Sequence, residues 1–268
     1  MAQHDLDAQI RTYYADHFDE AGRLVTRSAA GRVEHRRTRS LVAGLLAPGS
    51  RVLDVGGATG AHAGWLAADG HQVTLIDPVP EQVAAAARIG TFDARVGDAR
   101  DLQVDDASVD AVLLLGPLYH LRSADDRHLA LTEAHRVLRP GGTLVAAGIS
   151  RIAALLDLLL AHDERPATDV LAALLDEGAS PYDPAAGVFP VGHFHDAAEL
   201  RAEVQSAGFT QVTVTGVEGP ASLGMEVLPP DDALVDAGCA LAEAADAVPM
   251  IRDLSGHLLA VGVRAAEG

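Results

Sequence analysis

The 268-residue chain has 38 acidic and 20 basic residues, and its net charge of −18 argues against RNA or DNA as a partner, because non-specific nucleic-acid binding needs a basic surface. Its single cysteine, Cys239, excludes an intramolecular disulfide and any metal site built from several cysteines. No stretch approaches the roughly 20 apolar residues of a membrane span, so we expect a cytoplasmic protein without a membrane partner.

Residues 1–47 have the apolar spacing of helices, which ends at a proline-glycine stop. Six arginines lie between Arg23 and Arg39, against the acidic trend of the whole chain. A charged run of this kind usually forms a solvated helix face. The alternative is that one of these arginines, or Tyr13 or Tyr14, folds over a ligand and closes its site.

The next hundred residues alternate between apolar strands and helices. The predicted strands are 51–55, 72–76, 92–96, 109–115 and 143–148, and the predicted helices are 61–69, 79–89 and 125–138. Strands that are apolar on both faces and alternate with helices form a parallel sheet covered on either side. We therefore predict a doubly wound α/β fold.

This regular pattern is interrupted twice in the rest of the chain. Residues 151–195 and 219–255 are longer than a simple crossover requires, and they read as insertions that cap the ligand-binding edge of the sheet. A helix at 196–208 and strands at 211–217 and 257–264 resume the pattern, so the strands total seven. We expect one domain over 1–268, with an N-terminal helical cap at 1–47 and a cofactor-binding core at 50–148.

The segment RVLDVGGATG, at 51–60, predicts a strand, a tight glycine turn and a helix start. Gly56, Gly57 and Gly60 let the backbone turn sharply and approach a ligand closely, while the helix start offers unpaired N–H groups. The dinucleotide fingerprint G-x-G-x-x-G requires a glycine two positions after its first one, and counted from Gly56 that position is Ala58, so this turn does not match an NAD site. An acid, Asp54, precedes the glycines instead.

Five motifs in this order resemble the class I S-adenosylmethionine-dependent methyltransferases, whose fold is Rossmann-like. They are DVGGATG, VTLID, GDARDL, VDAVLLLGPLYHL and EAHRVLRPGGTLV. The resemblance implies that Asp54 meets the methionine part of the cofactor, that Asp77 holds the ribose, and that Asp98 and Ala99 read the adenine edge. The alternative is that these three aspartates only cap helices or stabilise turns, as many aspartates do. With Tyr14, the predicted cofactor-binding set is Tyr14, Asp54, Gly56, Gly57, Gly60, Asp77, Pro78, Asp98, Ala99, Leu115 and Gly116.

Tyr119 and His120 follow the fourth strand, at the reaction site of this family. A hydroxyl or an ammonium acceptor must lose a proton, and histidine is the natural base near neutral pH. His120 is therefore our candidate general base, unless it only packs within its loop. Tyr119, His193 and His195 are candidate substrate residues.

The histidines at 193 and 195 also allow a metal site with Asp196, since alternate residues of an extended segment share one side. Asp196 fits equally well as the N-cap of the following helix, with Glu199 completing a capping box. We favour the cap and predict no metal.

The sequence thus predicts transfer of a methyl group from S-adenosylmethionine to an oxygen or nitrogen of a small molecule, with S-adenosylhomocysteine as product. A less specific resemblance of the N-terminal segment and of residues 193–220 to enzymes that act on small molecules suggests specialised biosynthesis. Carbon methylation, a nicotinamide-dependent oxidoreductase and a non-catalytic regulator that binds S-adenosylmethionine are the alternatives. The oligomeric state, monomer or homodimer, stays open.

Overall fold

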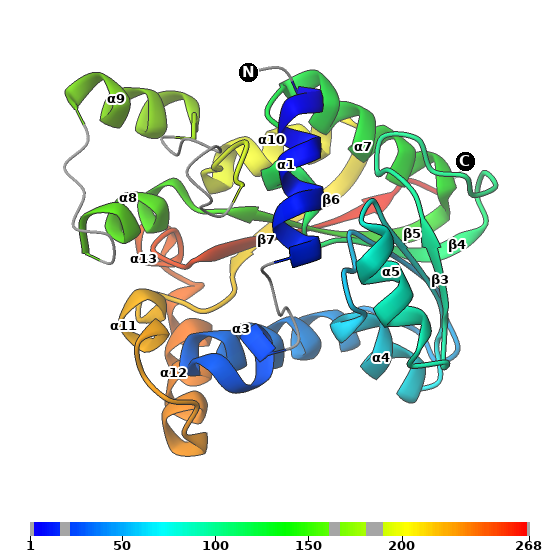
Figure 1. Cartoon of the computed structure of the whole chain (residues 1–268), viewed down its shortest axis with the longest axis horizontal. Coiled ribbons are helices and arrows are strands. Elements are labelled where there is room, and N and C mark those ends of the chain that lie inside the picture. The colour runs from blue at the N-terminus through cyan, green and yellow to red at the C-terminus, as the bar shows by residue number, and fades with distance from the viewer. Residues whose placement is uncertain (1–2, 17–21, 161–166, 181–189, 267–268) are drawn as a thin grey trace.

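The computed structural model describes residues 3–16, 22–160, 167–180 and 190–266. Its described strands form one seven-stranded sheet in the order β3-β2-β1-β4-β5-β7-β6 (Figure 1). The strands are β1 Arg51–Val55, β2 Gln72–Asp77, β3 Asp93–Val96, β4 Val109–Leu114, β5 Leu138–Ile149, β6 Phe209–Gly216 and β7 His257–Arg264. Only β7 runs antiparallel to its neighbours in this sheet, which confirms the predicted doubly wound, mostly parallel fold.

The two faces of the sheet bury alternate residues of each strand under different helices (Figure 1). Leu53 and Val55 face α7 and α10, whereas Val52 faces α3, α4 and α5. The period of two along a strand produces this division. The helices are α3 Ala29–Ala43, α4 Ala61–Ala68, α5 Pro80–Ala87, α7 Ala124–Val137 and α10 Ala197–Ser206.

The RPGG segment at 139–142 differs from the sequence prediction, because it belongs to β5 rather than to a turn before it. Val109 of β4 pairs with Leu138, and after an irregularity Ala111 pairs with Thr143. Pairing on both sides draws this segment into the strand, and Gly141 adopts a φ of 79°, in the left-handed region that glycine tolerates. The turn residues thus become a bulge within a longer strand.

The remaining helices surround the edge of the sheet where the parallel strands end. They are α1 Gln3–Asp16, η1 Arg23–Arg27, α6 Pro117–His120, α8 Arg151–Leu160, α9 Thr168–Glu177, α11 Ser222–Glu226, α12 Asp232–Ala245 and α13 Pro249–Arg252. α8 and α9 pack around Tyr119 and Phe194, whereas α11 and α12 pack on α3. No helix among the described residues has the length and apolar character needed to cross a membrane.

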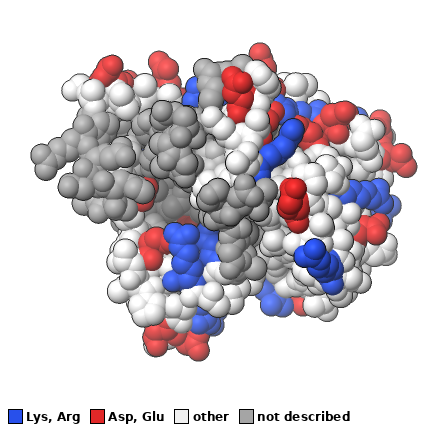
Figure 2. All heavy atoms as spheres, in the orientation of Figure 1, with Lys and Arg blue, Asp and Glu red and all other residues white. Residues whose placement is uncertain are grey.

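The arginines between 23 and 39 divide into two groups. Arg32 and Arg36 pair with Asp232 and Asp236 of α12, so they fasten this helix to α3. Basic and acidic side chains lie interspersed on the face shown in Figure 2. Arg23 instead lines a cavity, which leads to the site.

Candidate active site

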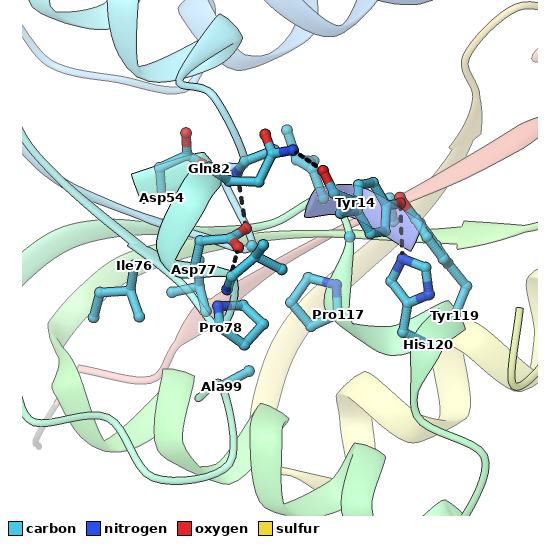
Figure 3. Close-up of a pocket in the computed structure, with 18 of the residues that line it drawn as sticks. Tyr14, Asp54, Ile76, Asp77, Pro78, Gln82, Ala99, Pro117, Tyr119 and His120 are labelled. Carbon is cyan, nitrogen blue, oxygen red and sulfur yellow. Dashed lines mark hydrogen bonds between the residues drawn. The ribbon is translucent and has the colours of Figure 1, made fainter. Parts of the chain in front are cut away.

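A cavity of about 1320 Å³, its open mouth included, lies at the carboxyl edge of the parallel strands. The predicted site residues that line it are Tyr14, Asp54, Gly56, Gly57, Asp77, Pro78, Asp98, Ala99, Leu115, Gly116, Tyr119 and His120 (Figure 3). Gly60, His193 and His195 are described but do not line it. Gly60 begins α4 with its Cα against Phe92, where a Cβ would clash.

The glycine turn after β1 has the close contacts that exclude a side chain. A Cβ on Gly57 would lie 2.7 Å from the Asp54 Oδ2 atom, and one on Gly56 would lie 2.8 Å from Pro117 Cδ. Ala58 adopts a φ of 46°, the left-handed region that glycine tolerates best. The turn therefore forms with alanine at this position, at a cost of about 1–2 kcal/mol.

Asp54 and Asp77 end neighbouring strands and are both buried. Asp77 accepts hydrogen bonds from the backbone N–H groups of Val79 and Ala58, each at 2.9 Å, so it also braces the glycine turn. Asp54 Oδ2 has no hydrogen-bond partner among the described residues. Burial, and then the charge of Asp77, raises the pKa of Asp54 to about 7, and burial raises the pKa of Asp77 to about 6. A donor or cation in the cavity would relieve this unfavourable burial.

Asp98 lies at another wall of the cavity, where Arg100 pairs with it at 2.6 Å and with Asp7 of α1 at 2.8 Å. Burial opposes ionisation of Asp98, but the hydrogen bonds from Arg100 outweigh it and lower the pKa of this carboxyl. The pair attaches α1 to the loop after β3. Sequence reasoning identified Asp98 but missed Arg100, although the two lie only two positions apart in the GDARDL motif.

His120 of α6 uses both ring nitrogens. Nδ1 lies 2.8 Å from the carbonyl oxygen of Pro190 and therefore donates, so Nε2 of the neutral ring accepts from the Tyr14 hydroxyl at 3.1 Å (Figure 3). Burial lowers the pKa of His120 to about 4. The histidine is thus a neutral hydrogen-bond acceptor held between α1 and the segment at Pro190.

Another part of the cavity wall contains a charged cluster that sequence reasoning missed. We call Arg23, Glu34, Glu218 and His257 the cavity cluster; Arg23, Glu34 and His257 line the cavity. The His257 Nδ1 atom lies 2.5 Å from Glu218 Oε1 and 3.8 Å from Glu34 Oε2. Burial opposes the charge of His257, but Glu34 and Glu218 outweigh it and raise the pKa of this imidazole to about 9. His257 reaches this edge because β7 is antiparallel, so its first residue pairs with Ile149 at the end of β5.

His193 and His195 lie behind the cavity wall, both buried. Their Nε2 atoms contact Glu199 at 3.1 Å and Glu203 at 3.2 Å, while Arg151 and Arg127 pair with the same two glutamates. We call these six residues the wall cluster. The structure therefore does not bring either histidine to the cavity.

Asp196 caps α10 by accepting from the Glu199 backbone N–H at 2.8 Å. The Glu199 carboxylate bonds Arg151 and His193, so it does not complete the predicted capping box. Among the described residues, two sets have potential metal-ligating atoms within 4.8 Å of one another inside each set: His193, His195 and Glu203 form one, and Glu34, Glu218 and His257 form the other. An arginine already pairs with a glutamate of each set, which competes with a metal ion for that carboxylate.

Comparison with known proteins finds one family match within the chain. Residues 53–146 match the family described as the methyltransferase domain. The chain is 35% identical over 120 residues to the ubiquinone/menaquinone biosynthesis C-methyltransferase UbiE of Rubrivivax gelatinosus, covering 43% of this chain and 47% of that protein. It is 33% identical over 112 residues to the O-methyltransferase rstn1 of Aspergillus nomiae, covering 38% of this chain and 47% of that protein. The chain thus spans about half the length of these relatives.

The fold has a counterpart in a crystal structure of a SAM-dependent methyltransferase from Methanosarcina mazei. The TM-score is 0.55 at 18% identity, and the match covers 85% of this chain and 98% of that one. At this identity the likeness concerns the fold. Residues 53–146 thus match the methyltransferase domain family, and the chain as a whole shares its fold with this SAM-dependent methyltransferase structure.

Proposed function

We propose that the protein transfers a methyl group from S-adenosylmethionine to an oxygen or nitrogen of a small molecule. The observation that carries this proposal is the pair of buried acids at the ends of β1 and β2. One carboxylate oxygen of Asp54 has no hydrogen-bond partner among the described residues. Asp77 braces the glycine turn, in which a Cβ on Gly56 or Gly57 would clash with neighbouring atoms. Such a site accepts a polar ligand that brings hydrogen-bond donors and positive charge.

The residues of the cavity fit this cofactor. Asp54 would meet the cationic methionine part, Asp77 the ribose hydroxyls, and Asp98 with Ala99 the adenine. When bound, S-adenosylmethionine supplies an electrophilic methyl group. The chain's own residues align the acceptor and exclude water from the cavity, and alignment alone accounts for much of a transfer rate.

Proton removal falls to His120 in this proposal. Its Nε2 atom accepts from the Tyr14 hydroxyl at 3.1 Å, so the acceptor's proton can pass to Tyr14 while the Tyr14 proton passes to His120. The low pKa of His120, about 4, keeps the ring neutral and able to accept at physiological pH. It also makes His120 a weak base, so this role suits an acceptor that is already acidic.

Carbon methylation is the second candidate, and the similarity to the C-methyltransferase UbiE favours it. A carbon acceptor with a neighbouring enol or phenol would use the same cavity. The position of a labelled methyl group in the product, determined by NMR, separates a methyl on carbon from one on oxygen or nitrogen.

Calorimetric titration with S-adenosylhomocysteine tests the cofactor. We expect binding to the wild type and loss of affinity by about tenfold or more in Asp77→Asn, since a charged hydrogen-bond acceptor is removed. Asp93→Asn is the matched control, because that aspartate is an exposed residue of β3 with 70% of its side chain accessible. Binding of NADH in place of S-adenosylhomocysteine would contradict the proposal.

Incubation with labelled S-adenosylmethionine and a metabolite extract then tests transfer. We expect a labelled small molecule that is absent with His120→Gln, which keeps a hydrogen bond to Tyr14 but cannot take a proton. Tight cofactor binding without any labelled product would favour a non-catalytic regulator.

A further inference from the structure

The carboxylates of the cavity cluster are already used within the protein. Both oxygens of Glu34 accept from Arg23, at 2.5 and 2.7 Å. Glu218 Oε2 accepts from the Ser255 hydroxyl and from the His257 backbone N–H, each at 2.8 Å, and Oε1 accepts from His257 Nδ1. Neither glutamate therefore has its full capacity left to bind a ligand.

The imidazole of His257 is different, because its hydrogen bonds to described residues use only Nδ1. The ring lines the cavity and its side chain is 20% exposed. Apolar side chains of Ala147, Val217 and Leu259 line the cavity with it, and the Tyr119 ring lies 6.2 Å from it between centroids. This part of the cavity wall thus combines apolar side chains with charged ones, and the His257 Nε2 atom has no hydrogen bond to the described residues.

The charge of His257 follows from the groups around it. Glu34 on α3 and Glu218 after β6 favour the imidazolium, Arg23 on η1 opposes it, and His62 on α4 lies within the same set of interacting groups. The balance raises the pKa of His257 to about 9, so both ring nitrogens carry protons at neutral pH. Since Nδ1–H is committed to Glu218, Nε2–H is a charged donor directed by a buried carboxylate.

We infer that this part of the cavity is the acceptor subsite, and that His257 Nε2–H binds an ionised oxygen of the acceptor. The acceptor class is an acidic hydroxyl compound, a phenol or an enol, whose proton passes through Tyr14 and His120 to water and leaves the bound oxygen ionised. An amine fits poorly, because its ammonium form would meet the imidazolium and Arg23 while both glutamates are occupied. The inference rests on the proposed function and selects oxygen over nitrogen within it.

Nitrophenols test this acceptor class, because the visible absorption of the phenolate reports its ionisation. A set that differs in the position of the nitro group is titrated into the protein saturated with S-adenosylhomocysteine, with 4-nitroaniline as the uncharged counterpart. We expect the wild type to bind a nitrophenol as the phenolate, and His257→Gln to weaken that binding by about tenfold or more. Affinity for 4-nitroaniline should change less than about twofold.

Two further variants keep the test decisive. His128→Gln, at an exposed residue of α7, should behave like the wild type. Glu218→Gln removes the charge that holds the proton on His257, so its phenolate affinity should be lost at a lower pH than in the wild type, where loss occurs around pH 9.

The outcomes separate this inference from the function on which it rests. Failure of the wild type to bind S-adenosylhomocysteine overturns both. Normal S-adenosylhomocysteine binding, combined with no phenolate binding or with equal phenolate affinity in wild type and His257→Gln, overturns the acceptor class alone. An equal loss for 4-nitroaniline would show that the His257 side chain acts through shape rather than charge, which also overturns it.

Discussion

The wall cluster and the cavity cluster are built from the same residue types but behave differently. In the wall cluster Arg127 and Arg151 supply positive charge to Glu203 and Glu199, and burial lowers the pKa of His193. In the cavity cluster Arg23 forms an ion pair with Glu34, whereas Glu218 pairs with His257, which supplies the positive charge beside this carboxylate. Burial thus favours the neutral form of His193 beside Glu199, whereas Glu34 and Glu218 favour the charged form of His257.

The two clusters also differ in what they connect. The wall cluster joins α10 to α7 and α8 and is separated from the cavity, so its hydrogen bonds serve the packing of these helices. The cavity cluster joins α3, β7 and the segment after β6 at the cavity surface. This contrast predicts large stability effects at the wall and binding or pH effects at the cavity.

The largest expected effect is in the wall cluster. Arg127 is 3% exposed, bonds Glu203 at 2.7 Å and donates to the carbonyl oxygens of Leu121 and Arg122. Arg127→Ala leaves Glu203 without its arginine, so we expect a loss of about 3–5 kcal/mol in the free energy of unfolding. Urea denaturation measures it, with Arg95→Ala as control because its ion pair with Asp93 is exposed. Equal losses in both variants would contradict a structural role of the wall cluster.

The second effect is a pH dependence of stability from His257. Its pKa in the folded protein, about 9, lies above the ordinary value of 6.5, so its stabilisation is complete below pH 6.5 and is lost as the pH rises through 9. We expect this difference to amount to about 2 kcal/mol between pH 6.5 and 9.5. Unfolding of wild type and His257→Gln at both pH values isolates it. A constant difference between the two proteins would show that His257 does not carry the charge.

The third effect concerns Asp54, a cavity acid that has no arginine. With a pKa raised to about 7, Asp54 is largely protonated at pH 6 in the free protein. The ammonium group of S-adenosylhomocysteine favours a nearby carboxylate, so binding of this compound at pH 6 should release up to about one proton. Calorimetry in buffers of different ionisation enthalpy counts it. Asp54→Asn should abolish most of this release, and an unchanged release would assign the proton to another group.

The smallest effect is expected at His193, which sequence reasoning named as a substrate residue. His193→Gln replaces one hydrogen bond to Glu199, so we expect about 1 kcal/mol of lost stability and an unchanged KM for the acceptor. Steady-state kinetics with the acceptor identified from the labelled product checks this. A raised KM would return His193 to the substrate site and remove the distinction between the clusters.

Local signals account for what sequence reasoning predicted well. Apolar segments that alternate with helices predicted the seven strands. Asp54 and Asp77 were predicted as site residues from the motifs at the ends of β1 and β2. The RPGG segment lies outside the predicted strand 143–148 but belongs to β5 in the structure. Its pairing with β4 makes it part of the strand, and local propensity does not reveal such pairing. His257 was missed because its position depends on the antiparallel direction of β7.

The sequence by itself determined the layered α/β fold and the glycine turn, since both depend on the order of residues a few positions apart. Only the tertiary structure decided which histidines face the cavity. His193 and His195 are matched by arginines from α7 and α8, whereas His257 meets Glu218 and, from α3, Glu34, more than 200 positions away in the chain. The charge and role of a histidine depend on such through-space neighbours, because electrostatic interactions act across distance rather than along the chain.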